Sequence, residues 1–218
     1  MSVAVISIAR MSVAVINYDR IMGRWEPDAR GRLERAAMEL FLERGFEQTT
    51  VTEIASRAGL TQRTFFRHFA DKREVLFGGS AALQELLLSA LASAPESAAP
   101  IDAVAAALQA ASAVLQERRE YSRQRQAVIA ANPELQEREL IKLAALSAAL
   151  ADGLRQRGVT DPAASLAAEM GIAVFRIAIE RWQNDTGQRD LPQLMRESLD
   201  VLKAMTAGGS VVTAPGAA

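Results

Sequence analysis

The sequence predicts an all-α protein, with a small helical head at its N-terminal end and a larger helical body after it. Two features of the composition favour helices. Half of the 218 residues are apolar but only 5% are aromatic, and alanine, a strong helix former and a poor strand former, dominates many segments. The third observation is the pattern, because apolar residues recur at helical spacing between Gly, Pro, Ser, Thr, Asn and Asp boundaries. By this pattern the chain holds about nine helices and no strand.

The first helix of the head is predicted over residues 27–44, where Pro27 suits a first turn and apolar residues recur on one face. Gly45 is the stop signal of this helix. Thr50 and Glu53 have the spacing of a capping box, so we expect them to open a second, short helix.

A third helix begins almost at once, since Gly59 ends the second helix and Thr61 can cap the next. Two helices joined by so tight a turn form a helix-turn-helix. Asp71 and Glu74 repeat the capping-box spacing, and we expect them to open a helix over 72–92.

The body follows a loop at 92–100 that is rich in small residues and proline. Asn132-Pro133 and Asp161-Pro162 each read as a cap followed by a first turn. The predicted body helices span 101–120 with an arginine-rich continuation, 133–157, 162–182 and 192–205.

The composition excludes several kinds of site. The chain has no cysteine, which excludes disulfides, thiolate zinc sites and a thiol nucleophile. A single histidine excludes a multi-histidine metal centre, and no Gly-rich phosphate loop of standard spacing is present. We therefore expect no metal, no cofactor and no enzymatic activity.

The motif MSVAVI occurs at 1–6 and again at 11–16. Each apolar run is far too short to span a bilayer, and no basic segment precedes the first. We expect residues 1–23 to be a disordered extension and 207–218 a disordered tail. With neither a signal nor a membrane span, the cytoplasm is the expected location.

The third head helix combines bulky rings with cations. Three of the seven phenylalanines fall within five positions, beside the only histidine. Phe65 and Phe69 lie four residues apart and share a face that we expect to pack on the head. Off this face lie Thr61, Gln62, Thr64, Arg67 and His68, with Phe66 at its edge. A helix that packs one face and offers the other to DNA needs both residue classes.

The polar face has the chemistry of base recognition. Gln62, Arg63 and Thr64 occupy the N-terminal half of the helix, which enters the major groove in helix-turn-helix proteins. Arginine can bond guanine, glutamine adenine, and the threonine methyl can contact thymine. Residues 57–73 carry a local charge of +4 in a chain of net charge −1. The five basic residues are Arg57, Arg63, Arg67, Lys72 and Arg73, against Asp71.

Two other classes of protein are compatible with these residues. An all-α enzyme or ligand-binding protein with an incidental basic helix pair would show the same pattern, because a basic run is commonly a solvated face. An architectural DNA-binding protein would need a broad basic surface, whereas residues 78–218 hold 13 basic and 16 acidic residues. A regulated, sequence-specific repressor fits best.

The run AAMELFLERGFEQTTVTEIASRAGLTQRTFFRHFADKREVLF resembles the TetR family of bacterial repressors almost position by position. The resemblance implies an all-helical homodimer with an N-terminal DNA-binding head and a C-terminal body that houses the effector pocket and the dimer interface. The implied partner is a palindromic double-stranded operator. We accordingly expect the DNA-binding domain at 24–77 and the effector-binding and dimerisation domain at 78–206.

The same resemblance assigns DNA contacts by matching position. It implies that Thr50, Lys72 and His68 contact phosphate, and that Gln62, Arg63 and Thr64 face bases. Phe66 stands where many members have a tyrosine whose hydroxyl bonds phosphate, a bond that phenylalanine cannot make.

Part of the body, ERREYSRQRQAVIAANPELQERELIKLAALSAALADGLRQRG with the later RIAIERW, resembles the C-terminal domain of the mycofactocin-regulator branch. This implies long-chain acyl-CoA effectors. From the residues alone, a lining of alanine, leucine and isoleucine favours an apolar ligand, and nearby arginines could receive an anionic group. The alternative is that they pair with Glu117 and Glu120 on a wet surface. The arginines are Arg118, Arg119, Arg123 and Arg125.

The last two predicted helices have more apolar residues than one monomer face needs. TetR-like dimers use their final two long helices as a four-helix bundle, so the resemblance places the interface here. The candidate interface residues are Leu166, Met170, Val174, Ile177, Leu194, Leu199 and Leu202.

Overall fold

The computed structural model describes residues 28–187 and 189–207, which are helical apart from turns and loops. The all-α class is therefore confirmed for the described residues. They divide into two compact units, with the boundary between Leu76 and Phe77. The predictions for residues 1–27, which include the repeat and Pro27, and for 208–218 lie outside the described residues.

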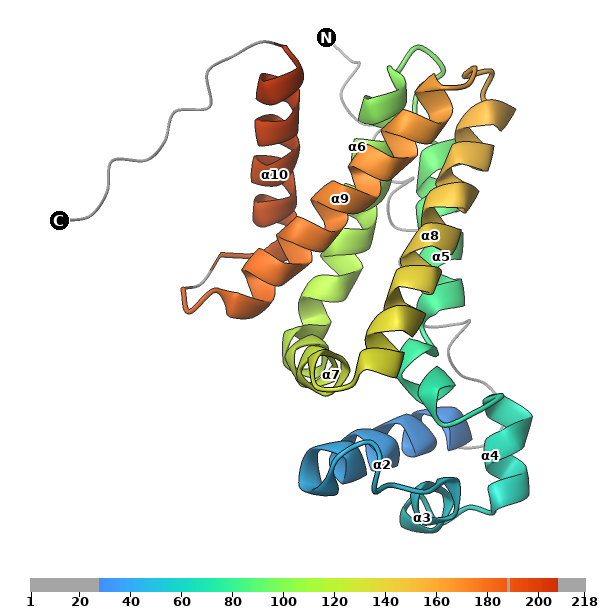
Figure 1. Ribbon diagram of the computed structural model, residues 1–218. Coiled ribbons are helices and arrows are strands. Elements are labelled where there is room, and N and C mark those ends of the chain that lie inside the picture. The colour runs from blue at the N-terminus through green and yellow to red at the C-terminus, as the bar shows by residue number, and fades with distance from the viewer. Residues whose placement is uncertain (1–27, 188, 208–218) are drawn as a thin grey trace, which may run out of the picture. The chain divides into compact units, whose positions relative to one another are not determined.

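The first unit is a three-helix head made of α2 (Ala29–Arg44), α3 (Val51–Arg57) and α4 (Gln62–His68) (Figure 1). Gly45, at a φ of 89°, ends α2 as predicted. The core of the unit is filled by large side chains from all three helices and the loop after α2, namely Leu33, Leu40, Phe46, Ile54 and Phe65.

The predicted continuous helix over 72–92 is wrong. Asp71 Oδ1 accepts hydrogen bonds from the backbone N–H groups of Arg73 and Glu74, but these open only a 3-10 helix, η1 (Arg73–Phe77). Gly78 and Gly79 then form a turn that separates η1 from α5 (Ser80–Ala92), because glycine is a poor helix former. By length and composition 73–92 could cross a membrane, but this break divides it, and α5 packs on other helices of the body.

The second unit packs its helices around one apolar core. After α5 come α6 (Pro100–Leu115), η2 (Gln116–Arg118), α7 (Arg119–Ala130), α8 (Pro133–Gln156), α9 (Ala163–Asn184) and α10 (Leu191–Thr206). Helix α9 contacts α6, α8 and α10, and α5 contacts α6 and α8 (Figure 1). The crossing of α6 and α9 needs Gly171, because a Cβ atom there would lie 2.3 Å from Val104 Cγ1.

The body helices begin and end close to the predicted residues, but the predicted side-chain caps of α8 and α9 do not form. Gly158 ends α8 at a φ of 86°. Asn132 holds the N-cap position of α8, yet its side chain donates to the Val128 carbonyl instead of capping. Pro162, not Asp161, is the N-cap residue of α9, and the Asp161 carboxylate instead accepts from Arg155 at 2.8 Å.

The two ends of the body are joined by polar bonds between distant parts of the chain. Lys203 Nζ lies 2.7 Å from Asp102 Oδ1, across 101 residues of sequence. The backbone N–H of Leu191 donates to Gln116 Oε1 at 2.7 Å. Helix α10 is thereby fastened to α6 and η2, which precede it by most of the body.

Candidate nucleic-acid interface

Local hydrogen bonds fix the beginning of α3. Thr50 Oγ1 accepts from the backbone N–H of Glu53 at 3.3 Å, and Glu53 Oε2 accepts from that of Thr50 at 2.9 Å. The predicted capping box is therefore present. The backbone bond from Thr50 lowers the pKa of Glu53, so the carboxylate stays charged at the positive end of the helix dipole.

The turn from α3 to α4 is as tight as the sequence predicts. Gly59 has a φ of +66°, a left-handed conformation that a residue with a Cβ atom adopts at a cost. The backbone N–H of Leu60 returns to the carbonyl of Ala55 at 2.8 Å. Thr61 Oγ1 then accepts from the N–H of Thr64 at 3.1 Å and caps α4. These bonds set where α4 starts.

Helix α4 has the two faces that the sequence predicts. Phe65 and Phe69 are buried, with ring centroids 5.4 Å apart, and hold the helix on the head. Gln62 and Arg63 are exposed at its N-terminal end, and Thr64 is partly buried. Arg63 has no recorded hydrogen bond or ion pair within the described residues, so its guanidinium group is available to a ligand.

Phe66 is on the exposed side of α4. Its side chain is 50% exposed, and its ring meets Phe65 edge-on, with centroids 5.5 Å apart. The Phe66 side chain cannot donate a hydrogen bond to a phosphate, because it has no hydroxyl group.

The local charge of +4 is smaller at the surface than the sequence indicates. Arg57 points to α2, where it pairs with Glu43 at 2.9 Å and Glu39 at 3.3 Å. The hydrogen bond with Glu43 raises the pKa of Arg57 and lowers that of Glu43. Arg73 pairs with Asp71 at 2.7 Å. Two of the five cations are thus compensated inside the head.

The residues expected at phosphates already have partners in the protein. Lys72 Nζ donates to the Phe46 carbonyl at 2.7 Å, which still leaves two N–H donors. The Thr50 hydroxyl is engaged in the capping box but remains exposed. His68 is half-buried in the last turn of α4, with its ring centroid 6.5 Å from that of Phe69.

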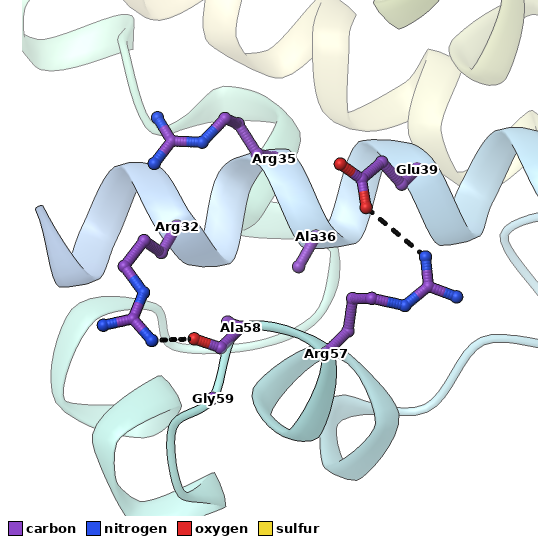
Figure 2. A pocket seen from close by; sticks show the side chains of 7 residues that line it. All are labelled: Arg32, Arg35, Ala36, Glu39, Arg57, Ala58 and Gly59. Carbon is purple, nitrogen blue, oxygen red and sulfur yellow. Dashed lines mark hydrogen bonds and ion pairs between the residues drawn. The ribbon is translucent and has the colours of Figure 1, made fainter.

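A pocket of about 360 Å³ lies between α2 and the α3–α4 turn. Arg32 and Arg35 of α2 both line it, and Figure 2 shows Arg32 directed toward the α3–α4 turn and Arg35 directed away from that turn, with Arg57 and Glu39 bonded to each other farther along α2. The Arg32 guanidinium donates to the carbonyl of Ala58, the last residue before Gly59. Neither α2 arginine was among the residues predicted to contact DNA. Their spacing of three residues, which puts both on one helix face, was the available signal.

The four arginines expected at an effector separate into two groups. Arg119 is structural, because its Nη2 donates to the carbonyls of Trp182 at 2.7 Å and Asp185 at 2.6 Å. Arg125 pairs with Glu139 at 2.9 Å and lies over the Phe77 ring. Arg118 and Arg123 are exposed, with no recorded partner among the described residues.

Arg119 also lies 3.9 Å from a carboxylate oxygen of Asp185, so Arg119 and Arg125 each have an acidic neighbour within the body. Asp185 is further held by Arg189 at 2.7 Å, a hydrogen bond that lowers the pKa of Asp185.

The seven apolar residues expected at a dimer interface also differ in placement. Val174, Leu194 and Leu199 are buried in the core of the body, which corrects their assignment because a second chain cannot reach them. Leu166 and Ile177 are 56% and 47% exposed on α9. Met170 and Leu202 are partly buried.

Two protein-family models match the chain, one over each unit. The model of bacterial regulatory proteins of the tetR family matches residues 34–77, and the MftR C-terminal domain model matches residues 98–207. The second match alone spans half of the chain.

The chain belongs to the TetR family of bacterial transcriptional regulators.

Individual TetR-family relatives agree with this assignment. MftR of Mycobacterium tuberculosis, named as a mycofactocin biosynthesis regulator, is 28% identical over 196 residues, or 88% of this chain and 93% of that protein. TcmR of Streptomyces glaucescens is 44% identical over 81 residues, but the match spans only 37% of this chain and 36% of that regulator. The structure of FadR from Bacillus subtilis with stearoyl-CoA has a TM-score of 0.53 at 21% identity, and covers 78% of this chain and 96% of that one. This last likeness shows the fold alone.

Proposed function

We propose that this TetR-family protein is a sequence-specific DNA-binding repressor. It acts in the cytoplasm as a homodimer on a palindromic operator and is released by a small apolar or amphipathic effector. The observation that carries the proposal is the pair of faces on α4. Phe65 and Phe69 anchor the helix, while Gln62 and Arg63 project freely at the end that enters a major groove.

Sequence reading is assigned to the start of α4. Arg63 can donate two parallel hydrogen bonds to guanine O6 and N7, and the Gln62 amide can bond adenine N6 and N7. The Thr64 methyl can contact a thymine methyl. Thr61, the N-cap residue of α4, is the first residue of this proposed DNA-contacting group. Phosphate contacts are assigned to Thr50, Arg67, His68 and Lys72. Phosphate contacts position the protein but do not read sequence.

Dimerisation is assigned to the exposed apolar side chains of the last two helices. Leu166 and Ile177 lie eleven residues apart on α9, which is three helical turns and places them on one face. Val201 and Met205 are exposed in the same way on α10. Pairing these faces in a dimer would bury apolar surface that a single chain exposes to water. To bind successive major grooves, the two α4 helices of the dimer would have to lie about 34–36 Å apart, which is one turn of DNA.

The effector is assigned to the body, whose core consists of apolar side chains, mainly alanine and leucine. Long-chain acyl-CoA is the first class to test, because the body resembles the MftR C-terminal domain and a TetR-fold neighbour was solved with stearoyl-CoA. Arg118 and Arg123 are the arginines left to receive its phosphates, since Arg119 and Arg125 hold parts of the body together.

The decisive experiment is selection of duplexes from a random library by the purified full chain, followed by binding measurements on the selected sequence. We expect a palindromic consensus bound about 10³-fold or more tightly than arbitrary DNA at the same salt concentration. The double variant Gln62→Ala, Arg63→Ala should keep its helicity and lose the consensus. If the wild-type chain returns no preferred sequence, the proposal fails, and turnover on a substrate panel would then favour an enzyme.

A further inference from the structure

We propose that the pocket between α2 and the α3–α4 turn is a second DNA-backbone site, in which Arg32 and Arg35 bind a phosphate outside the helix-turn-helix. This inference rests on the proposed function, because it needs DNA to be the partner of the head. It adds a contact from a helix to which neither the sequence nor the family resemblance assigned one.

The charge of the pocket favours an anion. Its lining holds three guanidinium groups, from Arg32, Arg35 and Arg57, against the single carboxylate of Glu39. That carboxylate is already bonded to Arg57 at 3.3 Å, and Arg57 is compensated a second time by Glu43. The positive charge left for a ligand is therefore that of the two α2 arginines.

Neither of those arginines is committed to a strong ionic partner. Arg32 gives one N–H to a neutral acceptor, the Ala58 carbonyl, and a guanidinium group has five N–H donors. Arg35 pairs with Asp28 at 3.0 Å, but the two side chains are 64% and 54% exposed. An ion pair as exposed as this contributes little, so a phosphate can replace the carboxylate at small cost.

The shape of the pocket depends on the turn. A Cβ atom on residue 59 would lie 2.8 Å from Arg32 Nη2, so the glycine leaves room for the guanidinium group against the backbone. Figure 2 shows Arg32 lying across this turn, with its nitrogen bonded to the Ala58 oxygen. The pocket of about 360 Å³ is open and large enough for a phosphate group.

The position of the pocket matches the path of a DNA strand. Gly59 lies three residues before Gln62, the first residue of the helix that reads bases. A major groove is about 12 Å wide, so the backbone at its edge passes within several ångströms of a helix inserted in it. A phosphate beside the start of α4 would therefore meet the pocket that lines the turn.

The test compares salt dependence on a duplex of arbitrary sequence, so that no operator is needed. Arg35→Gln should lower the slope of log K against log salt by about one, because one fewer phosphate is neutralised. Its affinity would then fall about 3.5-fold less than that of the wild type between roughly 50 and 200 mM salt. Arg32→Gln should act alike, and Arg32→Lys, which keeps the charge, should retain the wild-type slope.

The matched control is Arg196→Gln, which removes the same charge from an exposed arginine on α10 with no recorded partner among the described residues. Its slope should equal that of the wild type. A wild-type slope in both Arg35→Gln and Arg32→Gln, with circular dichroism showing folded protein, would overturn the inference and leave Arg32 as a brace of the turn. If the wild-type chain itself binds no duplex, the proposed function fails instead.

A second measurement locates the contact. Neutral methylphosphonate groups are placed one at a time in the backbone of a selected operator. One position should weaken wild-type binding but leave Arg35→Gln unaffected, because that variant has already lost the partner of the phosphate. If every substitution weakens both proteins by the same factor, Arg35 contacts no phosphate.

Discussion

Lys72 Nζ lies 2.7 Å from the carbonyl oxygen of Phe46 and 4.0 Å from the centre of the Phe46 ring. One ammonium group thus ties the segment after α4 to the loop after α2, by a charged hydrogen bond and a cation–π contact. A residue expected only to touch DNA also stabilises the head.

Lys72→Ala should therefore affect both stability and binding. We expect the loss of the two contacts to cost the head about 1–2 kcal/mol, measured as faster hydrogen exchange of the α2 and α3 amides. Arg63→Gln is the control, since it removes a cation that has no recorded partner in the described residues. Unchanged exchange in Lys72→Ala would show that the side chain leaves Phe46 in solution.

Arg63→Ala should remove sequence discrimination at one operator position. A lost bidentate contact to guanine costs about 1–3 kcal/mol on the cognate duplex and little on a duplex already changed at that base pair. Competition binding with each of the four base pairs at that position measures this. An equal loss on all four duplexes would mean that Arg63 contacts only the backbone.

The capping box makes the stability of the head depend on acid. The pKa of Glu53 is lowered in the folded head, so its contribution is complete above the unfolded value, about 4.3, and is lost as the pH falls through the lowered folded value. Glu53→Gln should weaken this dependence between neutral and acidic pH. Hydrogen exchange of α3 across this range tests the expectation, and equally steep loss in the variant would assign the dependence to another carboxylate.

Thr50→Ala should destabilise α3 at neutral pH by about 1 kcal/mol, the usual effect of losing an N-cap oxygen. Thr52→Ala, an exposed threonine in the same helix, is the control and should have almost no effect. Hydrogen exchange of the first turn of α3 reports both changes. Equal protection in the two variants would show that the cap bond contributes nothing.

The dimer proposal is tested by placing charge on the exposed face of α9. Leu166→Glu with Ile177→Glu should give folded monomers that bind the selected operator poorly, because two buried carboxylates oppose association. Leu140→Glu, on an exposed apolar residue of α8, should remain dimeric. Sedimentation decides, and a dimer in the α9 variant would move the interface to another surface. Val174→Arg is unsuitable, since it places charge in the core.

Induction should appear as reciprocal coupling between effector and operator. Calorimetry with stearoyl-CoA should show binding that operator DNA weakens about 5–150-fold, corresponding to roughly 1–3 kcal/mol. Replacing Arg118 and Arg123 by glutamine should weaken the ligand without unfolding the body. A ligand bound equally well with and without operator is not the inducer.

The features of the head that the sequence predicted correctly are local ones. The capping box at Thr50, the stop at Gly45 and the left-handed Gly59 each depend on residues within a few positions, so short patterns suffice to find them. The failure over 72–92 is local too. The Asp71 cap starts only the 3-10 helix η1, and Gly78-Gly79 then prevents this helix from continuing into α5.

The errors in the body have a different origin. Arg119 bonds carbonyls that lie 63 and 66 residues away, and no pattern near an arginine shows which distant helix will need a donor. Val174 and Leu194 resemble interface residues in sequence because a helix that packs on several neighbours is apolar on more than one face. Only the packed structure separates core from free surface.

The bond between Lys203 and Asp102 bears on how the protein is made. The contacts that complete the head lie within residues 28–76, so it can fold while the ribosome is still adding the body. The bond from Lys203 to Asp102 can form only after the 101 residues between them have been made, so the packing of α10 on α6 follows the synthesis of the rest of the body. A nascent chain would therefore carry a finished head before the proposed dimer surfaces of α9 and α10 exist, and under the proposed function we expect a single head to hold DNA weakly. We expect that half-made chains do not occupy the operator, and that control begins only with complete protein.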